Sequence, residues 1–394
     1  MNAIKLVVLS NIICIYVIGK YKNLNRDKKV FSLAITLSAP TIITILASKI
    51  NFLNRAALTT NVGVVLSLTL CVASSFYLRL ICVSDYRIFI NSRLLFLIVL
   101  SGYAVLNGLM LSQSWLAQLG ILLIQLNAVR WSISSQDFFS ALHLAILIIL
   151  ILLLISSFQA GTLVPCRQDK CLIYNNVFSG LVGGNGLGLD LFVLYCALLY
   201  TSKFSMQIRI FFYLSSMMVI FTTSSRTAIL SFIFCSICYE MRRFLEHKFF
   251  MTIFVISTIC YSAYPLWGHY TEKAFTERGA LWLYAKSLIG DAGLVGFGTS
   301  FWTRLGVTQG FVANYGTHNM WLDVLVSLGY LGLIILLCIL ASFFIKKDSI
   351  NLKILVACLI FSGMNESTFI LWKLYPVSIV LIVLSVIERK RTPT

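Results

Sequence analysis

Charged residues are scarce in this chain, and acidic residues are the scarcest of them. Only 14 of the 394 residues are Asp or Glu, charged residues of both signs make up 11%, and hydrophobic residues make up 59%. A soluble core does not need apolar residues on this scale. The composition therefore excludes an ordinary soluble domain and predicts an all-α, polytopic integral membrane protein.

The few acids are also scattered, which argues against two common kinds of site. The sequence has no D-x-D pattern, so a divalent-metal site for a diphosphate is not predicted. It has no G-x-x-x-x-G-K-[ST] motif either, so P-loop nucleotide chemistry is not predicted. We therefore expect neither a metal nor another cofactor.

Lysine and arginine, in contrast, are plentiful, with 31 residues that give a net charge of +17. These residues are divided among short polar segments between apolar runs. We interpret them as topology signals of a membrane protein and predict no nucleic-acid partner.

The apolar runs predict about 12–13 transmembrane helices, because several runs are short enough for one pair to be re-entrant. The first run has no small-residue cleavage site after it, so we expect it to be a retained span and not a signal peptide. The runs cover residues 3–19, 30–48, 56–78, 94–111, 115–129, 139–158, 187–202, 210–223, 227–240, 249–265, 319–345, 354–371 and 374–387.

The basic residues also predict an orientation. If segment 20–29 is cytoplasmic, the cytoplasmic segments hold 20 of the 31 Lys and Arg, and the C-terminus is cytoplasmic as well. The two longest polar segments then lie on the outer side, whereas the side of the N-terminus depends on the number of spans. The predicted divisions are N-terminal helices 1–158, outer loop 159–186, central helices 187–265, main outer loop 266–318 and C-terminal helices 319–394.

A Gly-Thr-His-Asn segment at the end of the main outer loop leads directly into an apolar helix of about 25 residues. It puts His318, a base that works near neutral pH, at the mouth of a membrane helix. Asn319 is adjacent, and Asp323 follows within about one and a half helical turns. Gly329 and Gly332 form a small face on which another helix could pack. Simple capping of the helix by the His-Asn pair is the alternative interpretation.

Two arginines on the same predicted side offer a possible anion site. Arg226 follows a Ser/Thr-rich turn between two apolar runs, and interfacial snorkelling is the alternative to function there. Arg278 opens an amphipathic run, 277–290, whose alternative is a plain surface helix. Paired guanidinium groups suit the oxygens of a diphosphate, and a histidine can take the proton of an attacking sugar hydroxyl.

Three local patterns resemble the O-antigen ligase and O-antigen polymerase superfamily of polytopic glycosyltransferases. The first is Ser-Ser-Arg226-Thr-Ala-Ile-Leu, and the second is Arg278-Gly-Ala-Leu-Trp followed by Gly-Phe-Gly298. The third is His318-Asn319 with a nine-residue spacer before Gly-x-x-Gly332. The resemblance covers about 110 residues, from 222 to 332.

This resemblance implies an undecaprenyl-diphosphate-linked glycan as donor and a metal-independent, inverting transfer at the periplasmic face of a bacterial inner membrane. By analogy His318 would be the general base, and Arg226 and Arg278 would bind the diphosphate. Asn319 and Asp323 would orient the histidine.

The acceptor separates the two family activities. A polymerase transfers the glycan to another lipid-linked repeat unit, whereas a ligase transfers it to lipid A-core. We expect a polymerase, because the main outer loop is only about 50 residues long and the glycine-rich segment 183–188 resembles that of many polymerases. A chain-length regulator is then a possible partner. One departure is that neither Arg167 nor Arg278 is followed by glycine eleven residues on, as in some polymerases.

Other interpretations remain open from the residues. Asn185 and Asp190 form either a polar helix start or a sugar-binding site. Cys166 and Cys171 bracket a polar stretch and could form a disulfide if it faces an oxidising compartment. A flippase for the same lipid-linked glycans, or a membrane scaffold of a polysaccharide-assembly complex, would account for the same hydropathy.

Overall fold

The structure, a computed structural model, divides the chain into two compact units. The first unit comprises Met1–Phe89, Asn127–Ile237 and Ile379–Thr394, and the second comprises Ile90–Leu126 and Cys238–Ser378. The structure describes the whole chain except residues 1, 22–26, 48–62, 82–89, 112–114, 158–163, 166–175, 178–183, 203, 224, 273, 303–315, 346–348, 366–375 and 390–394.

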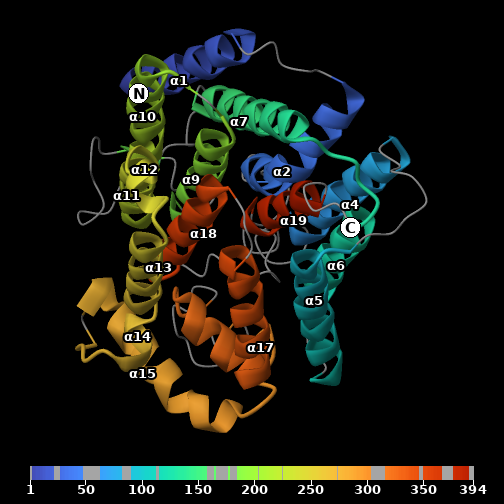
Figure 1. Cartoon of the computed structure of the whole chain (residues 1–394), viewed down its shortest axis with the longest axis vertical. Coiled ribbons are helices and arrows are strands. Elements are labelled where there is room, and N and C mark those ends of the chain that lie inside the picture. The colour runs from blue at the N-terminus through green and yellow to red at the C-terminus, as the bar shows by residue number, and fades with distance from the viewer. Residues whose placement is uncertain are drawn as a thin grey trace. The chain divides into compact units, whose positions relative to one another are not determined.

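The described residues are mostly helical, as the composition predicts, and a helix lies at each of the apolar runs (Figure 1). The helices are α1 (Asn2–Tyr21), α2 (Lys28–Ala47), α4 (Gly63–Ile81), α5 (Ser92–Met110), α6 (Leu116–Ala128), α7 (Ser135–Ser157), α9 (Gly184–Thr201), α10 (Met206–Thr222), α11 (Arg226–Glu240), α12 (Arg242–Leu245), α13 (Lys248–Ser262), α14 (Tyr264–Trp267), α15 (Ala274–Ala292), α17 (Met320–Ile345), α18 (Ile350–Ser362) and α19 (Pro376–Arg389).

Among the residues that the structure describes, three helices are long and apolar enough to cross a membrane: Ser92–Met110, Ser135–Ile155 and Met320–Ile345. Shorter apolar helices accompany them, so the chain has the character of a helical membrane protein. One small departure from an all-α chain is an antiparallel pair of two-residue strands, β1 (Val164–Pro165) and β2 (Asn176–Val177).

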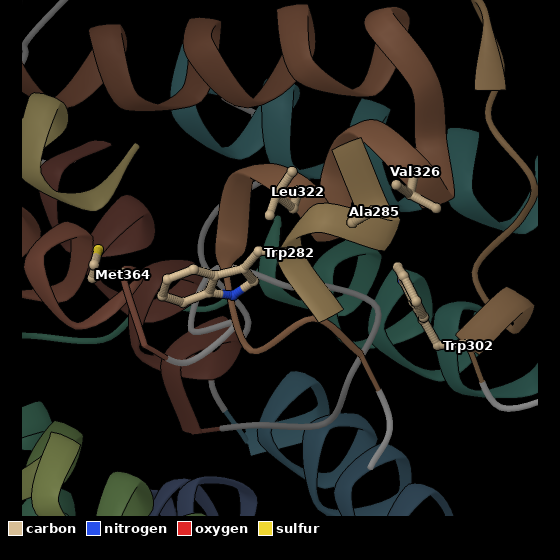
Figure 2. Packing of buried hydrophobic residues seen from close by; sticks show 6 residues of the cluster. All are labelled: Trp282, Ala285, Trp302, Leu322, Val326 and Met364. Atoms are coloured by element: carbon tan, nitrogen blue, oxygen red, sulfur yellow. The ribbon is translucent and has the colours of Figure 1, made fainter. Parts of the chain in front are cut away.

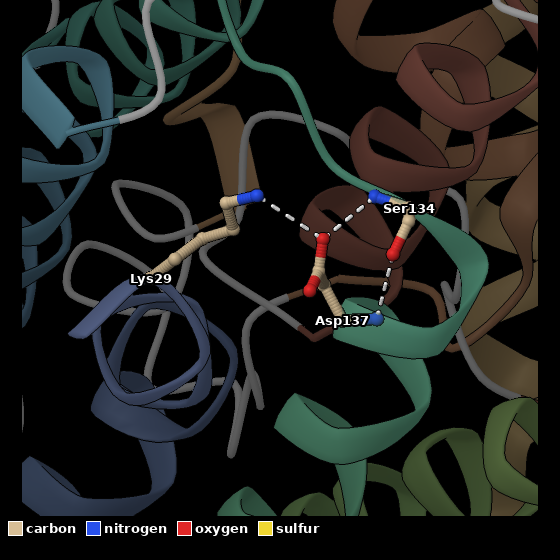
Figure 3. Close-up of polar contacts among 3 residues, drawn as sticks. All are labelled: Lys29, Ser134 and Asp137. Carbon is tan, nitrogen blue, oxygen red and sulfur yellow. Dashed lines mark hydrogen bonds and ion pairs between the residues drawn. The ribbon is translucent and has the colours of Figure 1, made fainter. Parts of the chain in front are cut away.

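In the first unit, α2 packs against α4 and α7, and α1 packs against α7 and α10. An ion pair joins the starts of α2 and α7, because Lys29 Nζ lies 3.3 Å from Asp137 Oδ2. The same oxygen accepts a hydrogen bond from the Ser134 amide at 2.9 Å, and Ser134 Oγ accepts one from the Asp137 amide at 3.1 Å (Figure 3). This reciprocal arrangement is a capping box for α7, to which Lys29 adds a contact with α2.

In the second unit, α17 is a broken helix. Gly329 has φ 64° and ψ −165° inside it, so the helical hydrogen bonds are interrupted there. The loop after α15 replaces them: the Phe297 and Gly298 amides donate to the Val326 and Ser327 carbonyls, each at 2.9 Å. On the other side of the break, the amides of Tyr330 and Leu331 donate to carbonyls of residues 293 and 294 at 3.2 and 3.1 Å.

This break corrects the small helix-packing face predicted for Gly329 and Gly332. A Cβ on Gly329 would collide with the Leu294 carbonyl oxygen, so a loop and not a helix packs there. A Cβ on Gly332 would collide with Leu328 of its own helix, because the helix is bent at the break. Only glycine combines the left-handed φ of residue 329 with so close an approach of another backbone segment.

The break is closed by side chains from α5. Tyr103 Oη donates to the Leu328 carbonyl at 3.1 Å, and Asn107 Nδ2 donates to the Val295 carbonyl at 2.8 Å. Irregular backbone at membrane depth is tolerated where protein groups satisfy it, and these bonds meet that condition.

A hydrophobic cluster holds α15 against α17 and the turn after α18 (Figure 2). Trp282 and Ala285 face inward from α15, as expected for the amphipathic run at 277–290. The cluster consists of Trp282, Ala285, Trp302, Leu322, Val326 and Met364.

Candidate functional site

His318 has an unusual backbone conformation. Its φ is 56°, in the left-handed region that costs a non-glycine residue on the order of 1–3 kcal/mol. The side chain is half-buried, whereas Thr317 and Asn319 on either side are both 0% exposed. His318 is therefore the partly exposed residue of this segment.

Asn319 joins three helices in the second unit. Its Oδ1 accepts hydrogen bonds from the amides of Trp321 and Leu322, each at 3.1 Å, so it is the N-cap of α17. Its Nδ2 donates to the Ser262 carbonyl at the end of α13 and the Met364 carbonyl after α18, at 2.9 and 3.1 Å. The capping interpretation is thus confirmed for Asn319, and the cap also fixes the backbone next to His318.

Asp323 fixes the other side of the segment. Its Oδ1 accepts from the Thr317 amide at 2.7 Å and from Thr317 Oγ1 at 2.8 Å. Asp323 is 1% exposed, so these donors satisfy a buried polar side chain that has no access to water. Gly316, with φ 143°, approaches so closely that a Cβ would lie 2.7 Å from Asp323 Oδ2. Thr317 was not predicted from the sequence to have a role. Its two hydrogen bonds to Asp323 nevertheless fix the backbone that directly precedes His318.

Arg278 is held on the same framework as His318. Its Nη1 donates to the Asn365 carbonyl, next to the Met364 carbonyl that accepts from Asn319. One turn further along α15, Trp282 Nε1 donates to the Thr317 carbonyl at 2.9 Å. The structure therefore brings the helix that carries Arg278 into contact with the segment that carries His318, and a shared site stays a prediction.

Tyr270 is another ionisable side chain close to this framework. Its ring packs edge-on against Trp282, with centroids 5.3 Å apart, and its Oη donates to the Pro265 carbonyl at 2.7 Å. Burial, together with the neighbouring Tyr264 hydroxyl, raises the pKa of Tyr270 to about 12. The phenol therefore stays protonated at neutral pH and is a poor rival to His318 as a base.

Arg226 lies in the first unit, at the start of α11, and is exposed. Ser225 Oγ accepts from the Ala228 amide at 3.3 Å, so the residue before the arginine caps that helix. The start of α9 packs closely on this turn: a Cβ on Gly188 would lie 2.5 Å from Thr223 Oγ1. Because Arg278 and His318 belong to the second unit, a cavity shared by all three residues stays a prediction.

Asp190 is 6% exposed in the interior of the first unit. Its Oδ2 accepts from Thr41 Oγ1 of α2 at 2.6 Å, and its Oδ1 has no hydrogen-bond partner in the described part of the chain. Asp190 thus packs between helices. Asn185 lies in the first turn of α9, and its sugar-binding role stays a prediction.

The site contains an imidazole and a guanidinium on a rigid support. Cys166 and Cys171 lie outside the described residues, so their pairing stays a prediction. Within the described ranges, no group of three or more His, Cys, Asp or Glu residues could hold a metal ion.

No protein-family model, no curated protein and no solved structure matches this chain. The support for a function therefore comes from the geometry of the site.

Proposed function

We propose that the chain is a glycosyltransferase that extends a lipid-linked glycan, an O-antigen polymerase in the sense of the family it resembles. The observation that carries the proposal is the strained, partly exposed His318. It is held by Asn319 and Asp323 on the framework that also holds Arg278. A protein keeps such strain where surrounding contacts over-determine it, and this happens most often at functional sites.

The proposed reaction is a displacement at the first carbon of the donor glycan. A hydroxyl of the acceptor repeat unit attacks that carbon, and His318 takes the hydroxyl proton as general base. The bond from the carbon to the diphosphate oxygen breaks, and the diphosphate leaves with the electron pair. Arg278, with Arg226 as the second cation, would stabilise the developing charge. The products are the lengthened lipid-linked glycan and undecaprenyl diphosphate.

The proposed setting is the bacterial inner membrane, with 12–13 spans, a cytoplasmic C-terminus and the site on the periplasmic side. The helices at the apolar runs support the spans, and the distribution of Lys and Arg supports the orientation. The substrate would enter from the membrane that the protein crosses.

The test is His318→Ala with His269→Ala as matched control, because His269 is an exposed histidine of the same unit. We expect His318→Ala to slow chain extension of purified lipid-linked repeat units by about 10²–10⁴-fold, the usual contribution of a general base. His269→Ala should leave the rate unchanged. Both proteins must insert in the membrane to the level of the wild type.

Lipopolysaccharide from a strain that lacks the protein distinguishes the acceptors. Core carrying a single repeat unit supports the polymerase, whereas bare core with leftover lipid-linked polymer indicates the ligase. Lipid-linked units that accumulate on the cytoplasmic side indicate a flippase. Unchanged glycan in the His318→Ala strain contradicts an enzyme and leaves the scaffold interpretation.

A further inference from the structure

Three basic side chains gather at one end of the second unit. Arg93 lies at the start of α5, Lys248 is the first residue of α13, and Lys353 lies at the end of the first turn of α18. Arg93 Nε donates to the Ser342 carbonyl at 3.0 Å, and Lys353 Nζ donates to the Phe344 carbonyl at 2.9 Å. Both carbonyls belong to the last turn of α17, so the two cations bind the same turn of helix.

Lys248 is close to this pair. It begins α13, which packs against α18 (Figure 1). Burial, together with the nearby charges of Arg93 and Lys248, lowers the pKa of Lys353, which precedes the predicted span 354–371. Like charges that come this close oppose each other's ionised forms, so an anion bound among the three would be stabilised by all of them.

The end of α17 explains the position of only two of the three cations. Carbonyl groups at a helix C-terminus attract positive charge, which accounts for Arg93 and Lys353. Lys248, in contrast, stands at a helix N-terminus, where the dipole disfavours a cation. The first turns of α13 and α18 contain no acidic residue, and their N-cap residues, His247 and Ser349, make no side-chain capping bond. The positive potential of this end is therefore not offset within the two helices.

The lysines are the accessible part of this cation cluster. Lys248 is exposed and Lys353 is partly exposed, whereas Arg93 is 1% exposed and its guanidinium carbon lies 4.7 Å from the centre of the Phe343 ring. Glu246, the acid that precedes the cap residue of α13, is itself exposed. An anion would therefore contact the two lysines directly, with Arg93 as a buried third charge.

This cluster is separate from the candidate functional site. Asn319, next to His318, donates to the Ser262 carbonyl at the other end of α13 and to the Met364 carbonyl after α18. Because α13 has 15 residues, its two ends are about 22 Å apart. On the predicted orientation, the end with the lysines faces the cytoplasm.

Exposed apolar side chains lie next to the cations. Phe249 directly follows Lys248 and is 69% exposed, and Ile345 directly follows Phe344 and is 82% exposed. A phosphate that is part of a lipid would place its acyl chains beside such side chains, whereas a free phosphate would gain nothing from them. The surroundings of the cluster therefore favour a lipid as the source of the phosphate.

We propose that Lys248 and Lys353, with Arg93 behind them, bind the phosphate of an anionic phospholipid in the leaflet opposite to His318. Basic pockets between helices on the cytoplasmic side of membrane proteins bind such headgroups. This lipid site goes beyond the proposed function and does not depend on it, because it lies at the other end of the unit.

The test measures lipid binding to the full-length protein in a neutral detergent by native mass spectrometry. Phosphatidylglycerol competes with phosphatidylcholine of the same acyl chains, because both carry the phosphate but choline cancels its charge. A basic residue near an anionic lipid surface contributes about fivefold to binding. We therefore expect the two lysines to give a preference of about 25-fold for phosphatidylglycerol.

Lys248→Gln and Lys353→Gln remove one charge each and keep a polar side chain of similar length. We expect each variant to lower the preference about fivefold, and the double variant to bind the two lipids almost equally. Lys286→Gln is the matched control, because Lys286 of the same unit donates to the Gly268 carbonyl, beyond the other end of α13. It should keep the preference of the wild type, and all variants should elute as folded protein.

Equal binding of the two lipids by the wild type would overturn the lipid site, and so would a preference that survives in the double variant. An equal loss in Lys286→Gln would also overturn it, by showing that any cation of this unit has the same effect. Glycerol 3-phosphate that displaces phosphatidylglycerol would assign the cluster to a soluble phosphate instead. His318→Ala should keep the lipid preference, so loss of chain extension in that variant tests the proposed function alone.

Discussion

At the scale of single residues, His318 combines backbone strain with proton-transfer chemistry. Its left-handed φ would suit glycine better than histidine. The segment is nevertheless fixed, because Thr317 is bound to Asp323, and Asn319 is bound to α13 and to the turn after α18. Glycine would fill the same position without strain, so a histidine there adds strain together with its imidazole.

The strain at residue 318 predicts that stability and activity separate. His318→Gly and His318→Ala both remove the base, but only glycine relieves the left-handed conformation. We expect the glycine variant to be more stable than the alanine variant by about 1 kcal/mol, measured by thermal unfolding in one detergent. Both should be equally inactive in chain extension. An alanine variant as stable as the glycine variant would show that residue 318 is not strained.

At the scale of elements, the broken helix α17 is the feature that supports the site. Its first half begins at the cap next to His318, and its break at Gly329 is filled by the loop that follows α15. The loop and the hydrophobic cluster both join α15 to α17, so the position of Arg278 depends on the break.

Gly329→Ala tests this dependence, and Gly102→Ala is its control. An added Cβ at residue 329 meets the Leu294 carbonyl at a positive φ, whereas one at residue 102 of α5 has no atom within 4 Å. We expect Gly329→Ala to destabilise the protein by about 2 kcal/mol or more and to lower activity. Gly102→Ala should be neutral or slightly stabilising. Similar thermal unfolding of the two variants would contradict a structural role of the break.

The sequence predicts the helices well, because a long apolar run fixes a helix whatever it packs against. It does not predict the break in α17. Two glycines three residues apart, such as Gly329 and Gly332, equally predict a small face on which another helix packs. The signal is non-local: Gly293, Gly296 and Gly298 supply the loop that fits Gly329. The roles of Thr317 and Trp282 were missed for the same reason, because each depends on a partner that only the fold brings near.

At the scale of the whole molecule, the proposed reaction needs contributions from both units. The second unit carries His318 and Arg278 on one framework, whereas Arg226 stands at the start of α11 in the first unit. Hydropathy and charge cannot place two units relative to each other, because both signals are local along the chain. That Arg226 and Arg278 bind the same diphosphate is therefore a hypothesis. It predicts an energetic coupling between the two arginines, and this coupling can be measured.

A double-mutant cycle with Arg226→Lys and Arg278→Lys measures it. Lysine keeps the charge but loses the planar fork that binds two oxygens at once, so each single variant should lower kcat/KM for chain extension by about tenfold or more. If both guanidinium groups bind one diphosphate, the loss of transition-state binding energy in the double variant will differ from the sum of the two single losses by a coupling energy of about 0.5–3 kcal/mol.

Arg243→Lys, at an exposed arginine in α12, is the control and should be neutral alone and additive with Arg278→Lys. Strict multiplication of the Arg226 and Arg278 effects would mean that the two arginines act independently, and only Arg278 would then remain in the proposed site.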